Sequence, residues 1–332
     1  MNLENLAALV NGGHSFIVTS HEAPDGDGLG AMYALCRALA GMGKGASAVL
    51  AEPLPQRYRF LDAAGIFQVA GANPATGLEA ESSVLMILDT NDPHYAGRVA
   101  EALLGKVRAY VLMDHHEPRG IDASKHLLDP SASSTCEIVY RLIRALGAPL
   151  EKDIAQALFT GIVYDTGSFG YPKTTEETFA CALELVRAGV KPYVIHNLLY
   201  ENSSVASLLL RKLVLSTLEL LADNRIAVQI MKIAHMDESG ALYEESEDLI
   251  NIPLRSESVQ VSVFFKENRT GVLRCSLRSK GNVNVAHIAQ NFGGGGHRTA
   301  AGFMCTLPLE QARVSVIDRL KVALQAGATL DG

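Results

Sequence analysis

Residues 16–28 read FIVTSHEAPDGDG, a short apolar run that passes directly into a histidine and two aspartates. The run at 16–20 is typical of a buried strand. Similar apolar runs recur further along the chain, at 46–51, 84–89 and 109–114. Segments with helical spacing lie between them, for example 30–42 and 95–104. Continuous apolar strands that alternate with helices predict a doubly wound, parallel α/β sheet.

The rest of the chain divides into a helical stretch and a part with a different pattern. Helical spacing continues through three segments, 136–146, 153–164 and 175–188. A long helical pattern at 203–221 has the character of a connector between domains. Three alternating strands and one helix follow it, at 226–233, 259–265, 272–277 and 284–292. We therefore predict an α/β domain at 1–190, a helical linker at 191–224 and a smaller α+β domain at 225–332.

Composition and charge restrict the class of protein. The 332 residues include 48% hydrophobic side chains, enough for a core in each of two domains. The N-terminus has no basic region and no apolar run approaches the ~20 residues of a membrane span, so we expect neither a signal peptide nor a membrane anchor. Five cysteines without a C-x-x-C pair predict reduced thiols in a cytoplasmic protein.

The net charge limits the partners. It is −7, and the Lys and Arg residues form no cluster in the sequence. Proteins that grip long duplexes neutralise many phosphates with clustered basic residues. We therefore exclude long duplexes, and if the substrate is a nucleic acid we expect it to be short, with its charge met locally.

Residues with catalytic chemistry follow three of the predicted strands. In chain order they are His21, Asp25 and Asp27, then Asp89, then Asp114, His115 and His116. A further carboxylate, Asp165, closes the apolar helical run GIVYD. One such aspartate alone is equally well explained as a turn residue or a helix cap. Polar groups at three strand ends together predict the crevice in which open α/β sheets bind ligands.

The charges in this cluster predict bound cations. Four aspartates in one crevice repel one another strongly, and two divalent ions would cancel that charge. We expect Asp25 and Asp27 in an extended loop, where they point to opposite sides and serve different ions. Ligands restricted to Asp and His favour Mn²⁺, with Mg²⁺, Co²⁺ or Zn²⁺ as alternatives. Asp89, at the centre of the crevice, is the predicted bridge between the ions.

The segment DGDGLG fits a calcium loop or a dinucleotide site less well. A calcium loop that starts at Asp25 needs a Glu at its twelfth position, where this chain has Cys36. A dinucleotide-binding fingerprint fits the spacing of Gly26 and Gly28. However, it would present two aspartates to the pyrophosphate, and it leaves the later Asp and His residues without a role.

Together these motifs resemble those of the DHH phosphoesterase family. The matching segments are H-x-x-x-D-x-D at 21–27, DTN at 89–91, DHH at 114–116, the later Asp165, and GGGGHRTAAGF at 293–303, which resembles the glycine-rich motif of the DHH-associated domain. The size and the C-terminal motif are most similar to the group of bifunctional oligoribonucleases and 3′-phosphoadenosine 5′-phosphate phosphatases.

The resemblance implies roles for individual residues. The implied ligands of one metal are His21, Asp25 and Asp89, and those of the other are Asp27, Asp89, His115 and Asp165. His116 would face the scissile phosphate without binding metal. Asp114 would orient a neighbouring group.

The C-terminal glycines form a second candidate site. Glycine lets the backbone approach a ligand closely and present N–H groups to an anion. A helix C-cap could also use glycine here, but it needs only one. The predicted substrate-binding residues are Arg278, Ser279, Gly294, Gly295, Gly296, His297 and Arg298.

We therefore expect a nuclease or nucleotide phosphatase that hydrolyses short oligoribonucleotides, 3′-phosphoadenosine 5′-phosphate, or both. Three alternatives stay open: a phosphodiesterase for cyclic or linear dinucleotides, an inorganic pyrophosphatase, and a catalytically inactive nucleotide-binding protein. The sequence also leaves open whether the chain forms a homodimer.

Overall fold

The computed structural model describes residues 1–71, 73–118, 121–280 and 283–327, without the side chains of residues 297, 326 and 327. The chain divides into two compact units, Met1–Asn202 and Ser203–Gly332. Helix α7 (Pro192–Tyr200) belongs to the first unit, and helix α8 (Val205–Leu215) belongs to the second. In the part of the chain that is described, no helix has both the length and the apolar character needed to cross a membrane.

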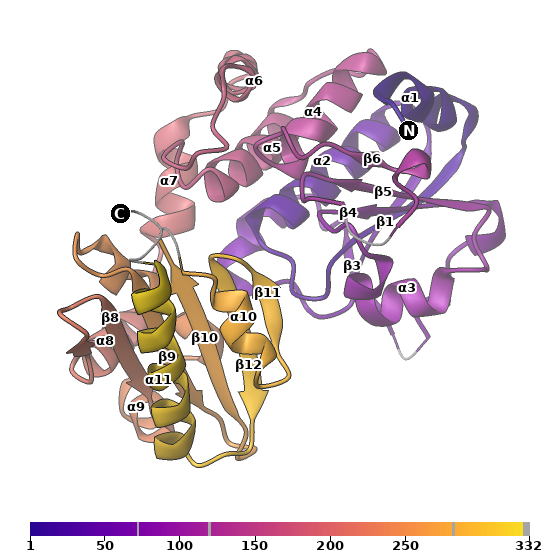
Figure 1. Ribbon diagram of the computed structural model, residues 1–332. Coiled ribbons are helices and arrows are strands. Elements are labelled where there is room, and N and C mark those ends of the chain that lie inside the picture. Colours follow the sequence, from indigo (N-terminus) through magenta and orange to yellow (C-terminus); the bar gives the residue numbers. More distant parts are fainter. Residues whose placement is uncertain (72, 119–120, 281–282, 328–332) are drawn as a thin grey trace. The chain divides into compact units, whose positions relative to one another are not determined.

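A six-stranded sheet forms the centre of the first unit (Figure 1). Its strands are β1 (Ser15–Ser20), β2 (Gly45–Leu50), β3 (Phe67–Val69), β4 (Val84–Leu88), β5 (Ala109–Asp114) and β6 (Leu127–Leu128). The order is β3-β2-β1-β4-β5-β6, and every neighbouring pair is parallel. This arrangement confirms the predicted doubly wound sheet. The short edge strands β3 and β6 were not predicted.

Helices cover both faces of this sheet. They are α1 (Leu3–Gly12), α2 (Gly26–Gly41), α3 (Gly97–Leu103), α4 (Thr135–Ala145), α5 (Lys152–Asp165) and α6 (Glu176–Arg187). Successive strand residues point to opposite faces, so Phe16 and Val18 join the core beneath α2, α4 and α5, whereas Ile17 joins the core beneath α3. Both cores are apolar, as continuous buried strands require.

The second unit contains a mixed six-stranded sheet. Its strands are β7 (Glu219–Leu221), β8 (Ile226–Met231), β9 (Val261–Glu267), β10 (Leu273–Ser279), β11 (Gly295–His297) and β12 (Ala300–Cys305). Only the β8–β9 pair is parallel in the order β11-β12-β10-β9-β8-β7. Helices α10 (Val285–Gln290) and α11 (Leu309–Gly327) pack on one face, and α8 packs on the other. Helix α9 (Ile233–Ser239) follows β8. The predicted α+β pattern is confirmed.

The expected helix at 203–221 was wrong in its last part. Helix α8 ends at Leu215, and β7 then pairs antiparallel with β8. Between these strands Ala222, Asp223 and Asn224 all have positive φ, from 53° to 64°. Asp and Asn tolerate the left-handed conformation, so the chain reverses here and the apolar residues of β7 join a sheet.

An ion pair joins α2 to α5 in the first unit. The Nε of Arg37 donates to Oδ2 of Asp153 over 2.8 Å, and the hydroxyl of Tyr33 donates to the same oxygen over 3.1 Å. Burial raises the pKa of Asp153, but the hydrogen bonds from Arg37, the amide of Ile154 and Tyr33, with the charge of Arg37, together lower it. The pair therefore stabilises the packing of two helices that also carry the site.

We predict that Asp153→Asn lowers the free energy of unfolding at pH 7 by about 0.5–1 kcal/mol, a modest effect because the pair is partly exposed. Since folding lowers the pKa of Asp153, its contribution is present above the unfolded pKa and is lost as the pH falls through the folded pKa. Urea unfolding of both proteins at pH 7 and pH 3 measures this. A difference that stays constant between these pH values would contradict the prediction.

Candidate active site

The ends of β1, β4 and β5 bring the predicted site residues to one edge of the sheet. Parallel pairing aligns Ser20 of β1 with Leu88 of β4, and Leu88 with Met113 of β5. The residues that follow these three positions therefore lie next to one another. The strand order reverses between β1 and β4, and open α/β sheets bind their ligands at such switch points.

Only Asp25 has the extended backbone that we expected, whereas Asp27 lies in a helix. Asp25 is the N-cap of α2, and its Oδ1 accepts hydrogen bonds from the amides of Asp27 (2.9 Å) and Gly28 (3.4 Å). Asp27 lies in the first helical turn and is fully buried. The helix begins inside the motif because Asp is a strong N-cap residue.

The beginning of helix α4 fixes the orientation of Asp27. The amide of Thr135 donates to Oδ2 of Asp27 over 2.6 Å, and the amide of Cys136 donates to Oδ1 over 2.9 Å. The hydroxyl of Thr135 also donates to Oδ1 of Asp89 over 3.1 Å. Ser134 is the residue that caps α4. The contacts of Thr135 and Cys136 with the carboxylates were not foreseen.

Glycines allow the helices to come close enough to form the site. A Cβ at Gly28 would lie 2.5 Å from Oγ of Ser20 and 3.2 Å from Oδ2 of Asp89. A Cβ at Gly161, on α5, would lie 2.6 Å from Oδ1 of Asp27. These positions therefore need glycine so that carboxylates can meet. This packing explains Gly28 of the DGDG segment without a dinucleotide.

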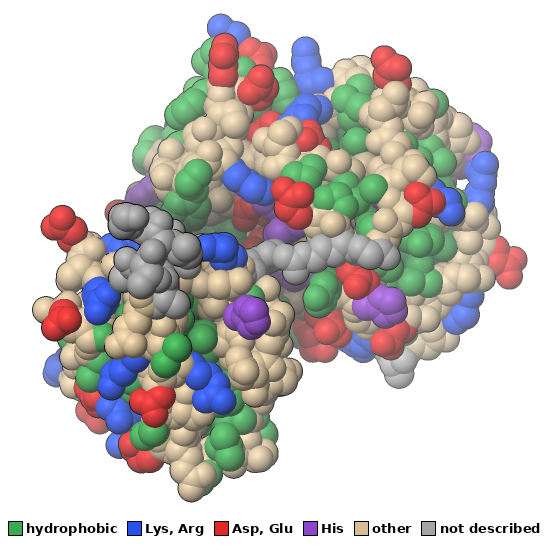
Figure 2. Space-filling view, in the orientation of Figure 1, with side chains coloured by type: hydrophobic (Ala, Val, Ile, Leu, Met, Phe, Trp, Pro, Cys, Tyr) green, Lys and Arg blue, Asp and Glu red, His purple; other side chains and the backbone are tan. Residues whose placement is uncertain are grey.

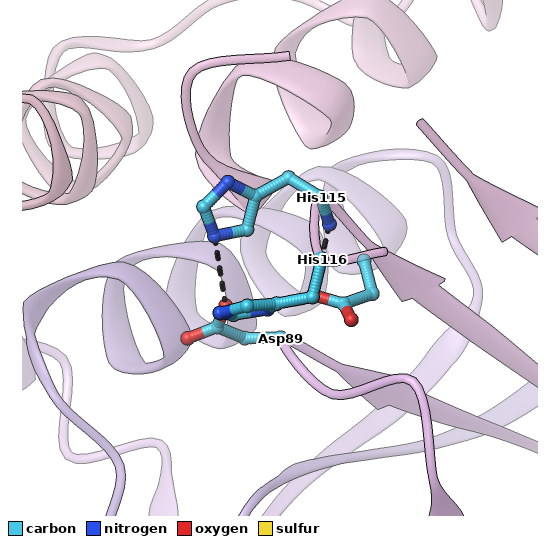
Figure 3. A group of neighbouring side chains, drawn as sticks. Asp89, His115 and His116 are labelled. Carbon is cyan, nitrogen blue, oxygen red and sulfur yellow. Dashed lines mark hydrogen bonds and ion pairs between the residues drawn. The ribbon is translucent and has the colours of Figure 1, made fainter. Parts of the chain in front are cut away.

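The six predicted metal ligands form two groups. In each group the ligand atoms lie within 4.8 Å of one another, and the groups are His21, Asp25 and Asp89, and Asp27, His115 and Asp165. Nε2 of His21 is 3.7 Å from Oδ2 of Asp89, and Nε2 of His115 is 3.8 Å from Oδ1 of Asp89. Figure 3 shows the ring of His115 pointing at the Asp89 carboxylate. Each oxygen of Asp89 therefore faces one group.

The charges at this edge fit divalent cations. Burial raises the pKa of Asp25 to about 7, and the charges of Asp89 and Asp165 add to the rise. Burial and the same two charges raise the pKa of Asp27 well above its usual value. Nε2 of His115 is buried 2.9 Å from Asp165, yet it forms no hydrogen bond of good geometry with the described residues. Bound cations would relieve the repulsion, and Nε2 of His115 could coordinate one of them. A set of ligands made up only of Asp and His suits Mn²⁺ or Mg²⁺.

Asp114 supports the histidine pair that follows it. It is fully buried, and its Oδ1 lies 2.7 Å from Nδ1 of His116 and accepts the amide of His115 over 2.8 Å. Burial lowers the pKa of His116, but the hydrogen bond and charge of Asp114, with the charges of Asp89 and Asp165, raise it overall. This geometry fixes the His116 ring beside the two ligand groups.

The predicted C-terminal residues gather at the ends of β10 and β11 in the second unit. Arg278 and Ser279 end β10, Gly295 and Gly296 are in β11, and Arg298 follows it. His297 is the last residue of β11, and its side chain lies outside the described part. The hydroxyl of Ser279 donates to the carbonyl of Val283 over 2.8 Å, which gives this side chain a structural role.

The close approach of β11 and β12 explains two of these glycines. A Cβ at Gly294 would collide with the backbone of Gly302, and one at Gly296 would collide with the backbone of Ala300. A Cβ at Gly295 would meet nothing within 4 Å. Packing therefore requires glycine at 294 and 296, but not at 295.

Comparison with known families gives matches to both units. The model described as "DHH family, N-terminal domain" matches residues 15–162, and that described as "DHHA1 domain" matches residues 223–325. The first match contains five of the six predicted metal ligands and all of the DHH motif. The second contains the glycine-rich segment.

Individual proteins match over most of the chain. The bifunctional oligoribonuclease and PAP phosphatase of Thermus thermophilus is 33% identical over 310 residues, covering 92% of this chain and 89% of that protein. A cyclic-di-AMP phosphodiesterase of Bacillus subtilis is 30% identical over 75% of this chain and 37% of its own length. An exopolyphosphatase-related protein of Bacteroides fragilis shares the fold, with a TM-score of 0.90 at 24% identity, over 99% of this chain and 97% of that chain.

The contact of Thr135 with Asp89 predicts an effect on metal binding. Thr135→Val keeps the shape but removes the hydroxyl that orients Asp89, so affinity for Mn²⁺ should fall by about tenfold or more. Thr135→Ser keeps the hydroxyl and is the matched control. Calorimetric titration with Mn²⁺ measures both. Equal affinities for the Val variant and the natural protein would rule out this role.

Proposed function

We propose, from the premise that this chain belongs to the DHH family of phosphoesterases, that it hydrolyses short oligoribonucleotides, 3′-phosphoadenosine 5′-phosphate, or both. Family membership makes the chain a hydrolase of phosphate esters. The observation that carries the proposal is that Asp89 belongs to one ligand group and lies 3.8 Å from His115 of the other. Two adjacent groups with a carboxylate between them suit a pair of divalent ions acting on one phosphate.

The metal in our proposal is Mn²⁺, with Mg²⁺ or Co²⁺ as alternatives. His21, Asp25 and Asp89 would hold one ion, and the second would be held by the remaining group together with Asp89. Bound ions would neutralise the phosphate and activate a water as the nucleophile. His116, oriented by Asp114, would face the scissile phosphate and assist the departure of the leaving oxygen.

Charge supports a small substrate. The chain has a net charge of −7. On the face shown in Figure 2, the described Lys and Arg side chains are scattered among acidic ones and do not form a broad patch. A long duplex would need such a patch. We infer that the substrate carries few phosphates and that the reaction takes place in the cytoplasm, where the five free thiols would remain reduced.

The second unit would bind the part of the substrate that does not react. Arg278 and Arg298 would provide charge for a phosphate, and the backbone of Gly294, Gly295 and Gly296 would provide close contact, with His297 as a further donor. Ser279 completes this proposed set. Gly295 supports the idea best, because packing does not explain it.

Cyclic dinucleotides are the second candidate substrate. The similarity to a cyclic-di-AMP phosphodiesterase over 75% of this chain favours them. A side-by-side assay with Mn²⁺ would separate the candidates: short RNA, 3′-phosphoadenosine 5′-phosphate, cyclic di-AMP and inorganic pyrophosphate. Rapid release of phosphate from pyrophosphate alone, or tight nucleotide binding without turnover, would overturn the proposal.

The shared carboxylate gives the first test. Asp89→Asn keeps the shape but removes the charge that both groups share, so hydrolysis should fall at least about a thousandfold. The control is Asp92→Asn, because Asp92 caps a 3₁₀ helix three residues away and Asn caps equally well. Initial rates with Mn²⁺, together with circular dichroism to verify folding, measure the effect. Near-normal rates in folded Asp89→Asn would refute the metal assignment.

Gly295 gives a test of the second unit. Gly295→Ala adds a methyl group where nothing lies within 4 Å, so stability should change by less than about 0.5 kcal/mol. If substrate approaches this backbone closely, KM should rise several-fold while kcat changes little. Steady-state kinetics and thermal unfolding measure the two effects. An unchanged KM would remove Gly295 from the proposed binding set.

A further inference from the structure

The loop after Asp165 has an unusual backbone. Gly167, Ser168 and Phe169 follow one another with φ of 54°, 59° and 65°. Positive φ is uncommon for residues other than glycine, and it persists only where the surrounding structure holds the backbone in place. Strain of this kind concentrates at functional sites.

Contacts with α5 and α6 hold this loop. The carbonyl of Thr166 accepts the amides of Gly170 and Tyr171, both over 2.9 Å, and its hydroxyl oxygen accepts the amide of Phe169 over 3.0 Å. The ring of Phe169 stacks on that of Phe179, with centroids 5.3 Å apart and planes 19° apart. The loop is therefore a fixed turn that leads the chain from the end of α5 back to the site.

This turn places Lys173 beside His115. Its Nζ donates to the carbonyl of His115 over 2.9 Å and lies 3.4 Å from Nδ1 of the same residue. An ammonium group has three protons, and the carbonyl uses one of them. Its positive charge thus lies against the DHH motif, beside the ring of His115.

The charge at the site leaves a role for this cation. The two groups contain four aspartates, Asp25, Asp27, Asp89 and Asp165. Two divalent ions would cancel these four charges, and Asp114 pairs with His116. A phosphate ester then brings one or two further negative charges to the site, and a nearby ammonium would offset them.

We propose that Lys173 is a catalytic residue that binds a non-bridging oxygen of the substrate phosphate. The proposal rests on the proposed function and deepens it. A phosphomonoester is largely a dianion at neutral pH, whereas a phosphodiester is a monoanion, so the ammonium stabilises the monoester more strongly. Lys173 therefore also sets the balance between phosphatase activity on 3′-phosphoadenosine 5′-phosphate and diesterase activity on short RNA.

Kinetics with matched substrates test the proposal. Lys173→Met should lower kcat/KM about a hundredfold for 3′-phosphoadenosine 5′-phosphate and about tenfold for a diribonucleotide, and Lys173→Arg should restore part of both. Lys106→Met is the control, because Lys106 precedes β5 and so belongs to the opposite end of the sheet. Equal losses for the two substrates would overturn the assignment of specificity.

Binding measurements separate a substrate contact from a structural role. Calorimetry would compare Mn²⁺ affinity, and then inorganic phosphate affinity at saturating Mn²⁺, in the natural protein and in Lys173→Met and Lys173→Gln. A loss of phosphate affinity with unchanged Mn²⁺ affinity supports the proposal. A loss of Mn²⁺ affinity with unchanged phosphate affinity overturns it, because Lys173 would then act only through His115. The phosphate measurement remains decisive even if the natural protein hydrolyses neither nucleotide, a result that would refute the proposed function alone.

Discussion

Repulsion among buried carboxylates is the constraint on which this structure depends. Asp27 and Asp89 are nearly inaccessible to water, and neither could stay charged there without compensation. The protein supplies part of this compensation by hydrogen bonds. Two amides of α4 donate to Asp27, and one hydroxyl donates to Asp89. The hydrogen bond and charge of His21 lower the pKa of Asp89 to about 2 despite burial, whereas the charges of neighbouring aspartates add to burial and raise the pKa values of Asp25 and Asp27. Bound cations would relieve that repulsion. The fold thus holds the ligands in place before a metal binds, which costs stability and gains selectivity for divalent ions.

The sequence could place residues together in space where their type and their position at the end of a strand were enough to do so. Asp89 and His115 could be placed together because parallel strands end at a common edge. The extended loop expected around Asp27 was wrong. Gly26 and Gly28 are unfavourable in the interior of a helix, so the residue pattern did not indicate that Asp25 caps one. The amide of Cys136 could not be found at all, because a backbone N–H has no residue type and its partner is 109 positions away.

Long-range pairing explains the remaining differences. β11 consists of Gly295, Gly296 and His297, and glycine has low strand propensity. It forms a strand because β12 lies alongside, close enough that side chains at 294 and 296 would collide with its backbone. In the same way β7 joins a sheet because the turn before Arg225 reverses the chain. In both cases tertiary contact overrides local preference, which periodicity within one segment cannot reveal.

Asp89 unites the two halves of the site because it meets two demands that few residues meet together. Its backbone has φ of 61°, so the chain must turn sharply as it leaves β4. Glycine would adopt this conformation most easily but would provide no ligand, whereas Asp and Asn tolerate it better than other residues with side chains. Of these two, only Asp offers two equivalent anionic oxygens, and its oxygens face His21 and His115 separately. The turn and the short side chain together place the Asp89 carboxylate between the two histidines. A Glu on a regular strand has one more methylene and a different backbone, so its carboxylate would lie elsewhere.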